Sequence, residues 1–266
     1  MKLICLQLLS GGRKPPQLFV RKWAVVSLFT KIFQRNGERS PHCCAVIAAA
    51  GNSVRMEGED KLFIHVCGKP ILAHTIDIFQ RNSMVSEIII VTREDRIAVV
   101  GELCGTYSFD KVSKIMIGGP TRLESVLNGV MAVSKSAKLI AIHDGARPCV
   151  SETVVNGTIE AAAKFSAAAP AVKASSTIKK VKNGIVVSTA ERDSLFEIQT
   201  PQVFKADIIK SALTSALGKS IEMTDDCMAV ELIGVPIHTT EGSRNNIKIT
   251  TREDIAVVEA LLRNRV

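Results

Sequence analysis

The chain of 266 residues is predicted to be an α/β protein, doubly wound around a mostly parallel sheet. Two observations predict this class. Beyond residue 42, short runs rich in β-branched residues alternate with longer amphipathic segments, as in parallel sheets whose strands are joined by helices. Hydrophobic residues make up 46% of the sequence, enough for one large core. We therefore predict a basic N-terminal extension over residues 1–42 and a single domain over residues 43–266.

The expected strands are short and apolar, as buried parallel strands are. They lie at residues 45–49, 87–91, 114–117, 139–143, 168–172 and 236–240. Helices are expected between them at about residues 70–81, 95–104, 121–134, 151–165, 205–217 and 225–233. Pro70 suits the first turn of the first helix. The third helix has an apolar face made of Val126, Leu127, Val130 and Met131.

A closing helix is expected over residues 255–262, because Thr251 and Asp254 have the spacing of a capping box. One segment breaks the alternation of strands and helices. Residues 176–188 form two β-rich runs around Asn183-Gly184, a strong signal for a type I′ hairpin. An inserted hairpin at about residues 173–192 has no core of its own. It is expected to be a flap over the site or an arm that pairs with a second subunit, the alternative being a hairpin lying on its own domain.

The charge of the chain is concentrated in the extension. The formal net charge is +8, but residues 1–42 hold eight of the 34 basic residues and one of the 26 acidic ones. The remainder carries a balance of only +1. The domain therefore lacks the electrostatic footprint of a nucleic-acid-binding protein, and no nucleic-acid partner is expected.

The seven cysteines include no C-x-x-C pair and no spacing typical of zinc ligands. Free thiols in a reducing compartment are expected, and with them a cytoplasmic location. In the extension, the apolar run Leu3 to Leu9 is too short to span a membrane and lacks a cleavage signature. Phe19 to Arg35 has the spacing of a basic amphipathic helix, expected to pack on the domain or form a poorly ordered leader; membrane binding is the alternative.

Three loops that follow predicted strands carry the residues suited to phosphate chemistry. They are residues 51–61, 118–122 and 144–148. Since the carboxyl ends of parallel strands share one edge of a sheet, these loops should meet in one crevice. Arg55 and Lys61 offer positive charge for phosphoryl transfer, and Asp144 is a plausible contact for Mg²⁺ or a ribose. The P-loop pattern and the dinucleotide fingerprint are both absent from the first loop, so a bound nucleotide would be held by another loop type.

Motifs along the chain match, in the same order, those of one family. The series is Ala49-Ala50-Gly51 with Arg55-Met56 and Lys61, Gly118-Gly119-x-x-Arg122-x-x-Ser125-Val126, His143 to Pro148, Glu191-Arg192, Gln199 to Gln202, Thr224-Asp225-Asp226 and Asn246 to Thr250. Together these motifs, over roughly residues 44–264, closely resemble 2-C-methyl-D-erythritol 4-phosphate cytidylyltransferases. The resemblance implies a Rossmann-like nucleotidyltransferase fold and transfer of CMP from CTP to methylerythritol 4-phosphate, with release of pyrophosphate, in the non-mevalonate route to isoprenoids.

The resemblance also implies roles for individual residues. Arg55 and Lys61 would stabilise the α-phosphate during transfer, while Arg192 and Lys248 would hold the attacking phosphate. Contacts to cytidine and ribose would come from Ala49, Ala50, Gly51, Gly119 and Ser125. The polyol phosphate would be bordered by Arg147, Thr177, Thr200 and Thr224, with Asp144 near Mg²⁺. The hairpin would cross to a second subunit in a homodimer, so that Thr177 would act in the partner's site.

Several interpretations stay open at this point. Thr224 is an equally good helix N-cap, and Thr200 before Pro201 is consistent with a plain strand end. Asp60 departs from the family pattern and places a negative charge beside Lys61. The same fold and chemistry would serve a ribitol 5-phosphate cytidylyltransferase, because short motifs encode little of the acceptor pocket. The alternative from another class is a non-catalytic protein that binds a nucleotide or associates with a membrane through its basic leader.

Overall fold

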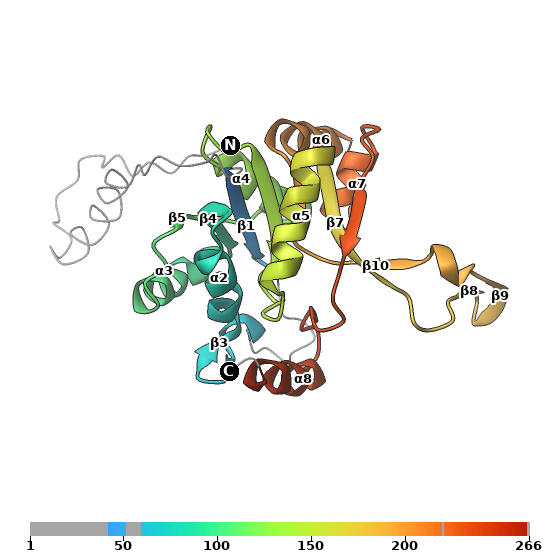
Figure 1. The fold of residues 1–266 in the computed structure, drawn as a ribbon, viewed down its shortest axis with the longest axis horizontal. Helices are drawn as coiled ribbons and strands as arrows, with labels where there is room; N and C mark the ends of the chain where they lie inside the picture. The colour runs from blue at the N-terminus through green and yellow to red at the C-terminus, as the bar shows by residue number, and fades with distance from the viewer. Residues whose placement is uncertain (1–41, 52–59, 220, 265–266) are drawn as a thin grey trace, which may run out of the picture. The chain divides into compact units, whose positions relative to one another are not determined.

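The structure is a computed structural model that describes residues 42–51, 60–219 and 221–264. The predicted leader helix at Phe19 to Arg35 and the candidate catalytic residue Arg55 lie outside the described residues. In the described ranges, the central feature is an eight-stranded sheet flanked by helices (Figure 1). Its strands are β1 (Cys43–Ala49), β4 (Val85–Thr92), β5 (Val112–Ile117), β6 (Leu139–Asp144), β7 (Ala167–Lys173), β10 (Phe196–Ile198), β11 (Gln202–Lys205) and β12 (His238–Glu241).

The order β5-β4-β1-β6 is parallel throughout, which confirms the predicted architecture on this side of the sheet. β11 runs antiparallel between β6 and β7, while β12 lies parallel to β7. β10 pairs with the second half of β7 and β11 with its first half. β10 and β11 thus run antiparallel beside β7, with residues 199–201 between them. These two strands were not predicted, because runs of three and four residues carry too little pattern.

Helices cover both faces of the sheet, as the alternation of the sequence predicted. They are α2 (Ile71–Arg81), α3 (Ile97–Thr106), α4 (Arg122–Ala132), α5 (Glu152–Phe165), α6 (Ala206–Gly218), α7 (Asp226–Glu231) and α8 (Arg252–Arg263). Short 3-10 helices occur at Lys61–Phe63, Glu94–Arg96 and Arg192–Ser194, and β2 (His65–Val66) pairs with β3 (Lys69–Pro70). Within the described ranges, no helix combines the length and apolar character needed to cross a membrane.

The core forms two layers, because successive side chains of β1 point to opposite faces of the sheet. Ile47 belongs to the layer that contains buried side chains of α2, α3, α5 and α8, whereas Val46 belongs to the layer with those of α4, α6 and α7. Gly129 allows α4 to lie close to the sheet, since a Cβ atom there would lie 2.6 Å from Val46 Cγ1. The predicted apolar face of α4 is wrong at one position, because Met131 is 58% exposed.

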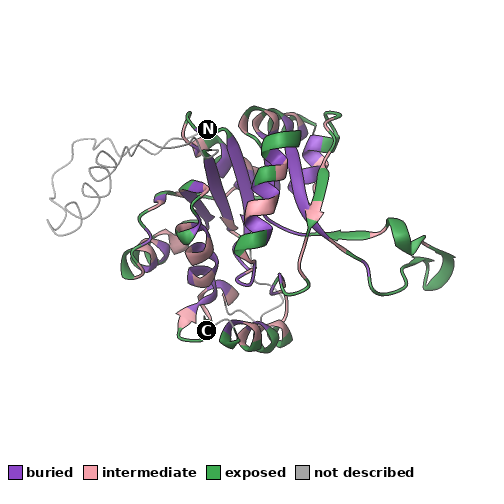
Figure 2. Ribbon diagram, in the orientation of Figure 1, coloured by how far each residue is buried: buried purple, intermediate pink, exposed green. Residues whose placement is uncertain are grey.

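The predicted hairpin is confirmed. β8 (Lys179–Lys182) and β9 (Ile185–Thr189) are antiparallel and joined by Asn183 and Gly184 at φ 51° and 77°, the positive pair that a type I′ turn requires. The hairpin extends away from the sheet (Figure 1), and every residue of both strands is exposed (Figure 2). It therefore does not lie on its own domain.

Candidate active site

Asp144 is the centre of the site at the carboxyl edge of the sheet. It is the last residue of β6 and is 8% exposed. Its Oδ2 atom lies 2.9 Å from Lys248 Nζ and 3.4 Å from Arg147 Nε. Burial opposes ionisation, but the positive charges of Lys248, Arg122 and Arg147 outweigh it and hold the pKa of Asp144 well below its usual range. Asp144 is therefore a carboxylate surrounded by cations, which suits a site for anionic substrates.

The segment that carries Lys248 is bound to the loop after Asp144. Arg147 Nη1 donates to the backbone oxygen of Asn246 at 2.7 Å, and the Ile249 N–H donates to the backbone oxygen of Ala146 at 2.9 Å. Lys61 Nζ in turn donates to the backbone oxygen of Ile249 at 2.6 Å. Segments nearly 190 residues apart in the sequence are thus joined, and the predicted cations Lys61 and Arg147 both bind the backbone of the segment that carries Lys248.

Asp60, which departs from the family pattern, has cationic partners of its own. Its Oδ2 atom lies 3.2 Å from Arg93 Nη2 and 3.3 Å from Arg96 Nε. Its Oδ1 atom accepts a hydrogen bond from the Leu62 N–H at 3.3 Å, which caps the short 3-10 helix that Lys61 begins. Two arginines therefore balance the negative charge that the sequence places next to Lys61.

The predicted nucleotide loops after β1 and β5 lie against each other. A Cβ atom on Gly118 would lie 2.6 Å from Ala50 Cβ and 2.8 Å from Ser125 Oγ, so only glycine permits this approach. Ser125 Oγ accepts from the Gly119 N–H at 3.0 Å and donates to the backbone oxygen of Thr121 at 2.8 Å. Ser125 is one of the predicted cytidine contacts. In this structure its hydroxyl makes hydrogen bonds within its own loop.

Ala49 and Gly51 are further predicted nucleotide contacts. Ala49 is the last residue of β1, and Gly51 lies two residues beyond it. Ala49 is 5% exposed, and Gly51 is exposed beside the undescribed residues 52–59. The Thr92 hydroxyl, at the end of β4, donates to the backbone oxygen of Ala49 at 3.4 Å, and the Gly118 N–H donates to the backbone oxygen of Thr92 at 2.8 Å. Strand β4 thus joins the two loops.

Arg122 and Asp226 form a buried ion pair to which the sequence assigned no role. The guanidinium donates to both carboxylate oxygens, at 2.8 and 2.6 Å, and Asp226 is fully buried. The charge of Asp226 outweighs the effect of burial and raises the pKa of Arg122. The pair joins the β5–α4 loop to the start of α7. Both residues belong to the motifs quoted above, but nothing in their spacing shows that they pair.

The structure also decides between interpretations of two threonines. The N-cap of α7 is Asp225, whose Oδ1 atom accepts from the Met228 N–H at 3.1 Å, so Thr224 is not the cap and its side chain is exposed. Thr200 is 4% exposed, and its Oγ1 atom accepts a hydrogen bond from the Asp144 N–H at 3.2 Å. Thr200 is therefore more than a strand end, because it fixes the backbone at the centre of the site.

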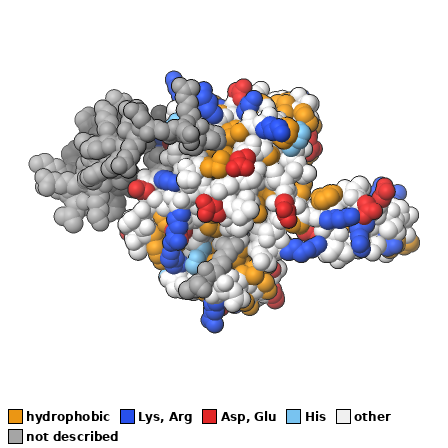
Figure 3. Space-filling view, viewed as in Figure 1, with side chains coloured by type: hydrophobic (Ala, Val, Ile, Leu, Met, Phe, Trp, Pro, Cys, Tyr) orange, Lys and Arg blue, Asp and Glu red, His pale blue; other side chains and the backbone are white. Residues whose placement is uncertain are grey.

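Arg192 and Thr177 are not part of this cluster within one chain. Both lie on the projecting arm and are exposed. Across the described parts of the chain, the Arg192 side chain forms no hydrogen bond or ion pair. Figure 3 shows hydrophobic and basic side chains next to one another on the arm. The predicted pairing of Arg192 with Lys248 around one phosphate is thus not made in the single subunit.

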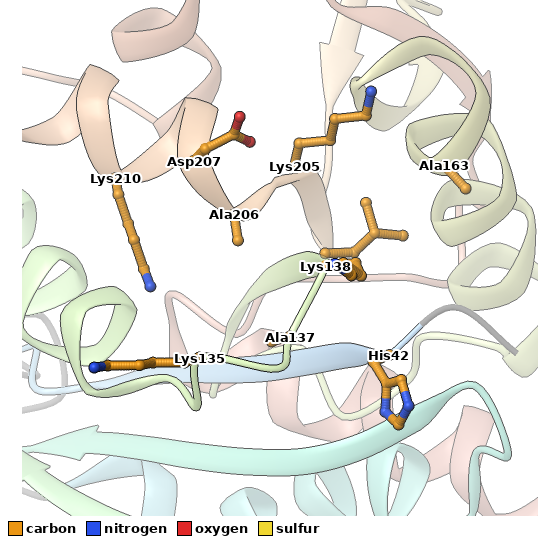
Figure 4. Close-up of a pocket in the computed structure, with 10 residues that line it drawn as sticks. His42, Lys135, Ala137, Lys138, Ala163, Lys205, Ala206, Asp207 and Lys210 are labelled. Atoms are coloured by element: carbon orange, nitrogen blue, oxygen red, sulfur yellow. The ribbon is translucent and has the colours of Figure 1, made fainter. Parts of the chain in front are cut away.

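A separate hollow of about 710 Å³ lies at the opposite edge of the sheet (Figure 4). It is lined by ten residues: His42, Lys135, Ala137, Lys138, Leu139, Ala163, Lys205, Ala206, Asp207 and Lys210. Leu139 begins β6, the strand that ends at Asp144, so the hollow lies at the amino ends of the parallel strands. Its lysine side chains point in different directions and do not converge on one ligand position. The candidate active site is therefore the cluster at the Asp144 edge.

The fold and this cluster define an α/β enzyme of the nucleotidyltransferase class, with cations and one carboxylate at the carboxyl edge of a mostly parallel sheet. The chain belongs to the 2-C-methyl-D-erythritol 4-phosphate cytidylyltransferase (IspD) family, whose model matches residues 43–264. A relative with that name from Clostridium acetobutylicum is 44% identical over 223 residues, which are 83% of this chain and 97% of the relative. One from Halalkalibacterium halodurans is 42% identical over 82% of this chain and 95% of its own length.

Solved structures agree with the family assignment. The 4-diphosphocytidyl-2C-methyl-D-erythritol synthase of Anaerococcus prevotii superposes with a TM-score of 0.75 at 31% identity, covering 84% of this chain and 97% of that one. The 2-C-methyl-D-erythritol 4-phosphate cytidylyltransferase of Francisella tularensis gives a TM-score of 0.70 at 28% identity, covering 83% and 99%. The predicted fold class is thereby confirmed.

Proposed function

We propose that the protein transfers CMP from CTP to 2-C-methyl-D-erythritol 4-phosphate and releases pyrophosphate, a step in isoprenoid precursor biosynthesis. The family assignment supports the reaction. The observation that carries it to this chain is the contact of Arg147 and Lys248 with the buried carboxylate of Asp144, with Lys61 bonded to the backbone of Ile249, the residue after Lys248. Two anions must meet in this reaction, and such a cluster of cations lowers their mutual repulsion.

The chemistry needs positioning more than proton transfer. A phosphate oxygen of the acceptor forms a bond to the α-phosphorus of CTP, and the bond to the bridging oxygen of the leaving pyrophosphate breaks. The acceptor phosphate is largely dianionic near neutral pH, so no general base is required. We assign the α-phosphate to Lys61 and, by resemblance alone, to Arg55. Lys248 and Arg147 are assigned to the acceptor phosphate, bordered by Thr200 and Thr224.

Asp144 fits the role of an Mg²⁺ ligand. The described residues contain no group of three or more His, Cys, Asp or Glu side chains that could hold a metal ion by themselves. Mg²⁺ at phosphoryl-transfer sites is commonly held by one or two carboxylates together with substrate phosphates and water. The ion pairs of Asp144 join its Oδ2 atom to Arg147 and Lys248, so the carboxylate is ionised as a metal ligand must be. Bound there, Mg²⁺ would neutralise phosphate charge.

The acceptor is tested by measuring pyrophosphate release from CTP and Mg²⁺, with methylerythritol 4-phosphate and ribitol 5-phosphate offered separately. We expect turnover with the first acceptor, loss of turnover on chelation of the metal, and recovery when Mg²⁺ is restored. Turnover with ribitol 5-phosphate alone would make the protein a cytidylyltransferase for another polyol phosphate. CTP binding without pyrophosphate release from either acceptor would support a non-catalytic nucleotide-binding protein.

We further propose that the protein is a homodimer whose arm completes the site of the partner. The arm exposes apolar side chains that soluble single chains normally bury: Ile178, Val181, Ile185, Val186 and Val187, which are 44–69% exposed. A hairpin of two strands is marginal without further packing, so a second subunit would stabilise it. Arg192 and Thr177 would then reach the partner's acceptor phosphate.

A mixing experiment tests this arrangement. Arg192→Ala and Lys248→Ala subunits are each expected to be nearly inactive as homodimers. If Arg192 acts in the partner's site, a hybrid dimer has one site with both residues intact, so equal mixing and exchange of subunits should restore about a quarter of wild-type activity. Two Lys248→Ala preparations mixed in the same way are the control. A mixture that stays inactive although hybrids form would place Arg192 in its own subunit's site.

A further inference from the structure

His143 has a hydrogen-bonding pattern that fixes its tautomer. It precedes Asp144 on β6 and is completely buried. Its Nε2 atom lies 3.2 Å from the backbone oxygen of Arg147, and a carbonyl oxygen can only accept a hydrogen bond. Nε2 therefore carries the hydrogen. Its Nδ1 atom faces the hydroxyl of Thr200, whose oxygen accepts from the Asp144 N–H, so Nδ1 is left to accept the hydroxyl hydrogen.

The same contacts fix the direction of the hydrogen bond to Thr200. Thr200 Oγ1 lies 3.0 Å from Nδ1 of His143. The hydroxyl of Thr200 donates to Nδ1, while the hydroxyl oxygen accepts from the Asp144 N–H at 3.2 Å. A directed path thus runs from the Asp144 N–H through the Thr200 hydroxyl to Nδ1, and from Nε2–H to the Arg147 backbone.

Strand pairing next to Thr200 and aromatic packing on His143 hold these two residues in place. In the antiparallel pairing of β11 with β6, Gln202 lies opposite Ile142. Thr200 lies two residues before β11 begins, and its hydroxyl accepts a hydrogen bond from the Asp144 N–H. The ring of Phe79, which is completely buried, packs against His143 with centroids 4.9 Å apart. The imidazole therefore has a packed face and two polar partners.

We propose that His143 is a positioning residue for the acceptor side of the active site. It joins Thr200 to the Arg147 backbone and so sets both in place relative to Asp144 without touching a substrate itself. The proposal rests on the function proposed above, in which Arg147 and Thr200 border the acceptor phosphate. It goes beyond that function, because no role had been assigned to this histidine.

The hydrogen-bond path is tested by nuclear magnetic resonance on protein with ¹⁵N-labelled histidine at neutral pH. We expect His143 to carry its hydrogen on Nε2 with a bare Nδ1, and its signals are identified by their loss in His143→Gln. Thr200→Ser, which keeps the hydroxyl, should leave the Nδ1 shift nearly unchanged, whereas Thr200→Val should move it. A hydrogen on Nδ1, or an Nδ1 shift that Thr200→Val leaves unchanged, would overturn the path.

The positioning role is tested by steady-state kinetics with each substrate varied in turn. His143→Gln can still donate toward the Arg147 backbone but loses Thr200, whereas His143→Asn can still accept from Thr200 but loses the Arg147 backbone. Either variant should raise KM for the acceptor about tenfold or more and leave KM for CTP within about twofold, since one buried hydrogen bond is lost on the acceptor side only. His65→Asn, at an exposed position on β2, is the matched control.

Equal changes in both KM values, or no change in either, would contradict the positioning role. If a His143 variant does not fold, the effect of Thr200→Ser and Thr200→Val on the Nδ1 shift of His143 carries the test, because only that shift reports the bond between the two residues. Failure of the proposed function is recognised separately. In that case the wild-type protein does not use methylerythritol 4-phosphate. The spectroscopic result on the hydrogen-bond path does not depend on that outcome.

Discussion

Replacing Lys61 by methionine is expected to lower kcat by at least about a hundredfold, with folding and CTP binding largely retained. Methionine keeps much of the side chain's length and apolar stem but removes the charge that Lys61 would place on the α-phosphate. Loss of one preorganised transition-state donor typically costs that much. The measurement is the initial rate of pyrophosphate release at saturating CTP, Mg²⁺ and acceptor.

Two comparisons make the Lys61 result specific. Lys138→Met removes the charge of an exposed lysine at the opposite edge of the sheet and should leave kcat unchanged. Lys61→Arg keeps the charge and a donor toward the Ile249 backbone, so it should recover part of the activity. A kcat within about tenfold of wild type in Lys61→Met would show that the electrostatic role is wrong, and that the 2.6 Å bond to Ile249 is only structural.

Replacing Asp144 by asparagine is expected to lower kcat by at least about a hundredfold and to raise the Mg²⁺ concentration needed for half-maximal activity. The amide is a poorer ligand for a hard cation, and it no longer balances Lys248, Arg147 and Arg122. Stability should fall by about 2 kcal/mol, less than for a fully buried pair because the Lys248 side chain is 43% exposed. Rates measured over a series of Mg²⁺ concentrations give the effects on kcat and on the Mg²⁺ dependence. Urea unfolding gives the change in stability.

Asp77→Asn is the matched control for Asp144. Asp77 also contacts two cations, Lys69 at 3.4 Å and Arg81 at 2.8 Å, but it lies on α2 in a partly exposed cluster. Its replacement should change stability by less than about 1 kcal/mol and leave the Mg²⁺ dependence unchanged. An unaltered Mg²⁺ dependence in Asp144→Asn would exclude Asp144 as the metal ligand, whatever its effect on kcat.

The doubly wound architecture and most elements could be predicted from the sequence. Strands and helices of ordinary length carry a period of two or of about 3.6 residues, and β1, β4, β6 and α5 were predicted within a few residues. The Asn183-Gly184 turn was equally clear, because few residue pairs adopt two positive φ angles. The strands β10 and β11 were missed, since their few residues are held by pairing with β6 and β7.

For the loops too, some features could be predicted from the sequence and others could not. That the described loop residues after β1, β5 and β6 meet at one edge follows from parallel strands and right-handed crossovers, so the sequence predicted it. The Arg122–Asp226 ion pair joins residues 104 positions apart and had no local signal. The pairing of Asp60 with Arg93 and Arg96 was equally invisible, because a sequence gives the neighbours along the chain and not those across it.

The sequence by itself determined the α/β class, the hairpin, the family resemblance and the candidate cations, because these depend on local periodicity, turn chemistry and ordered motifs. Only the tertiary structure decided which groups the site residues contact. It placed Lys61 on the Ile249 backbone, gave Asp60 two arginines, left Arg192 on the projecting arm, and set His143 between Thr200 and Arg147. The physical reason is that ion pairs and buried hydrogen bonds depend on distances across the fold, which no spacing along the chain encodes.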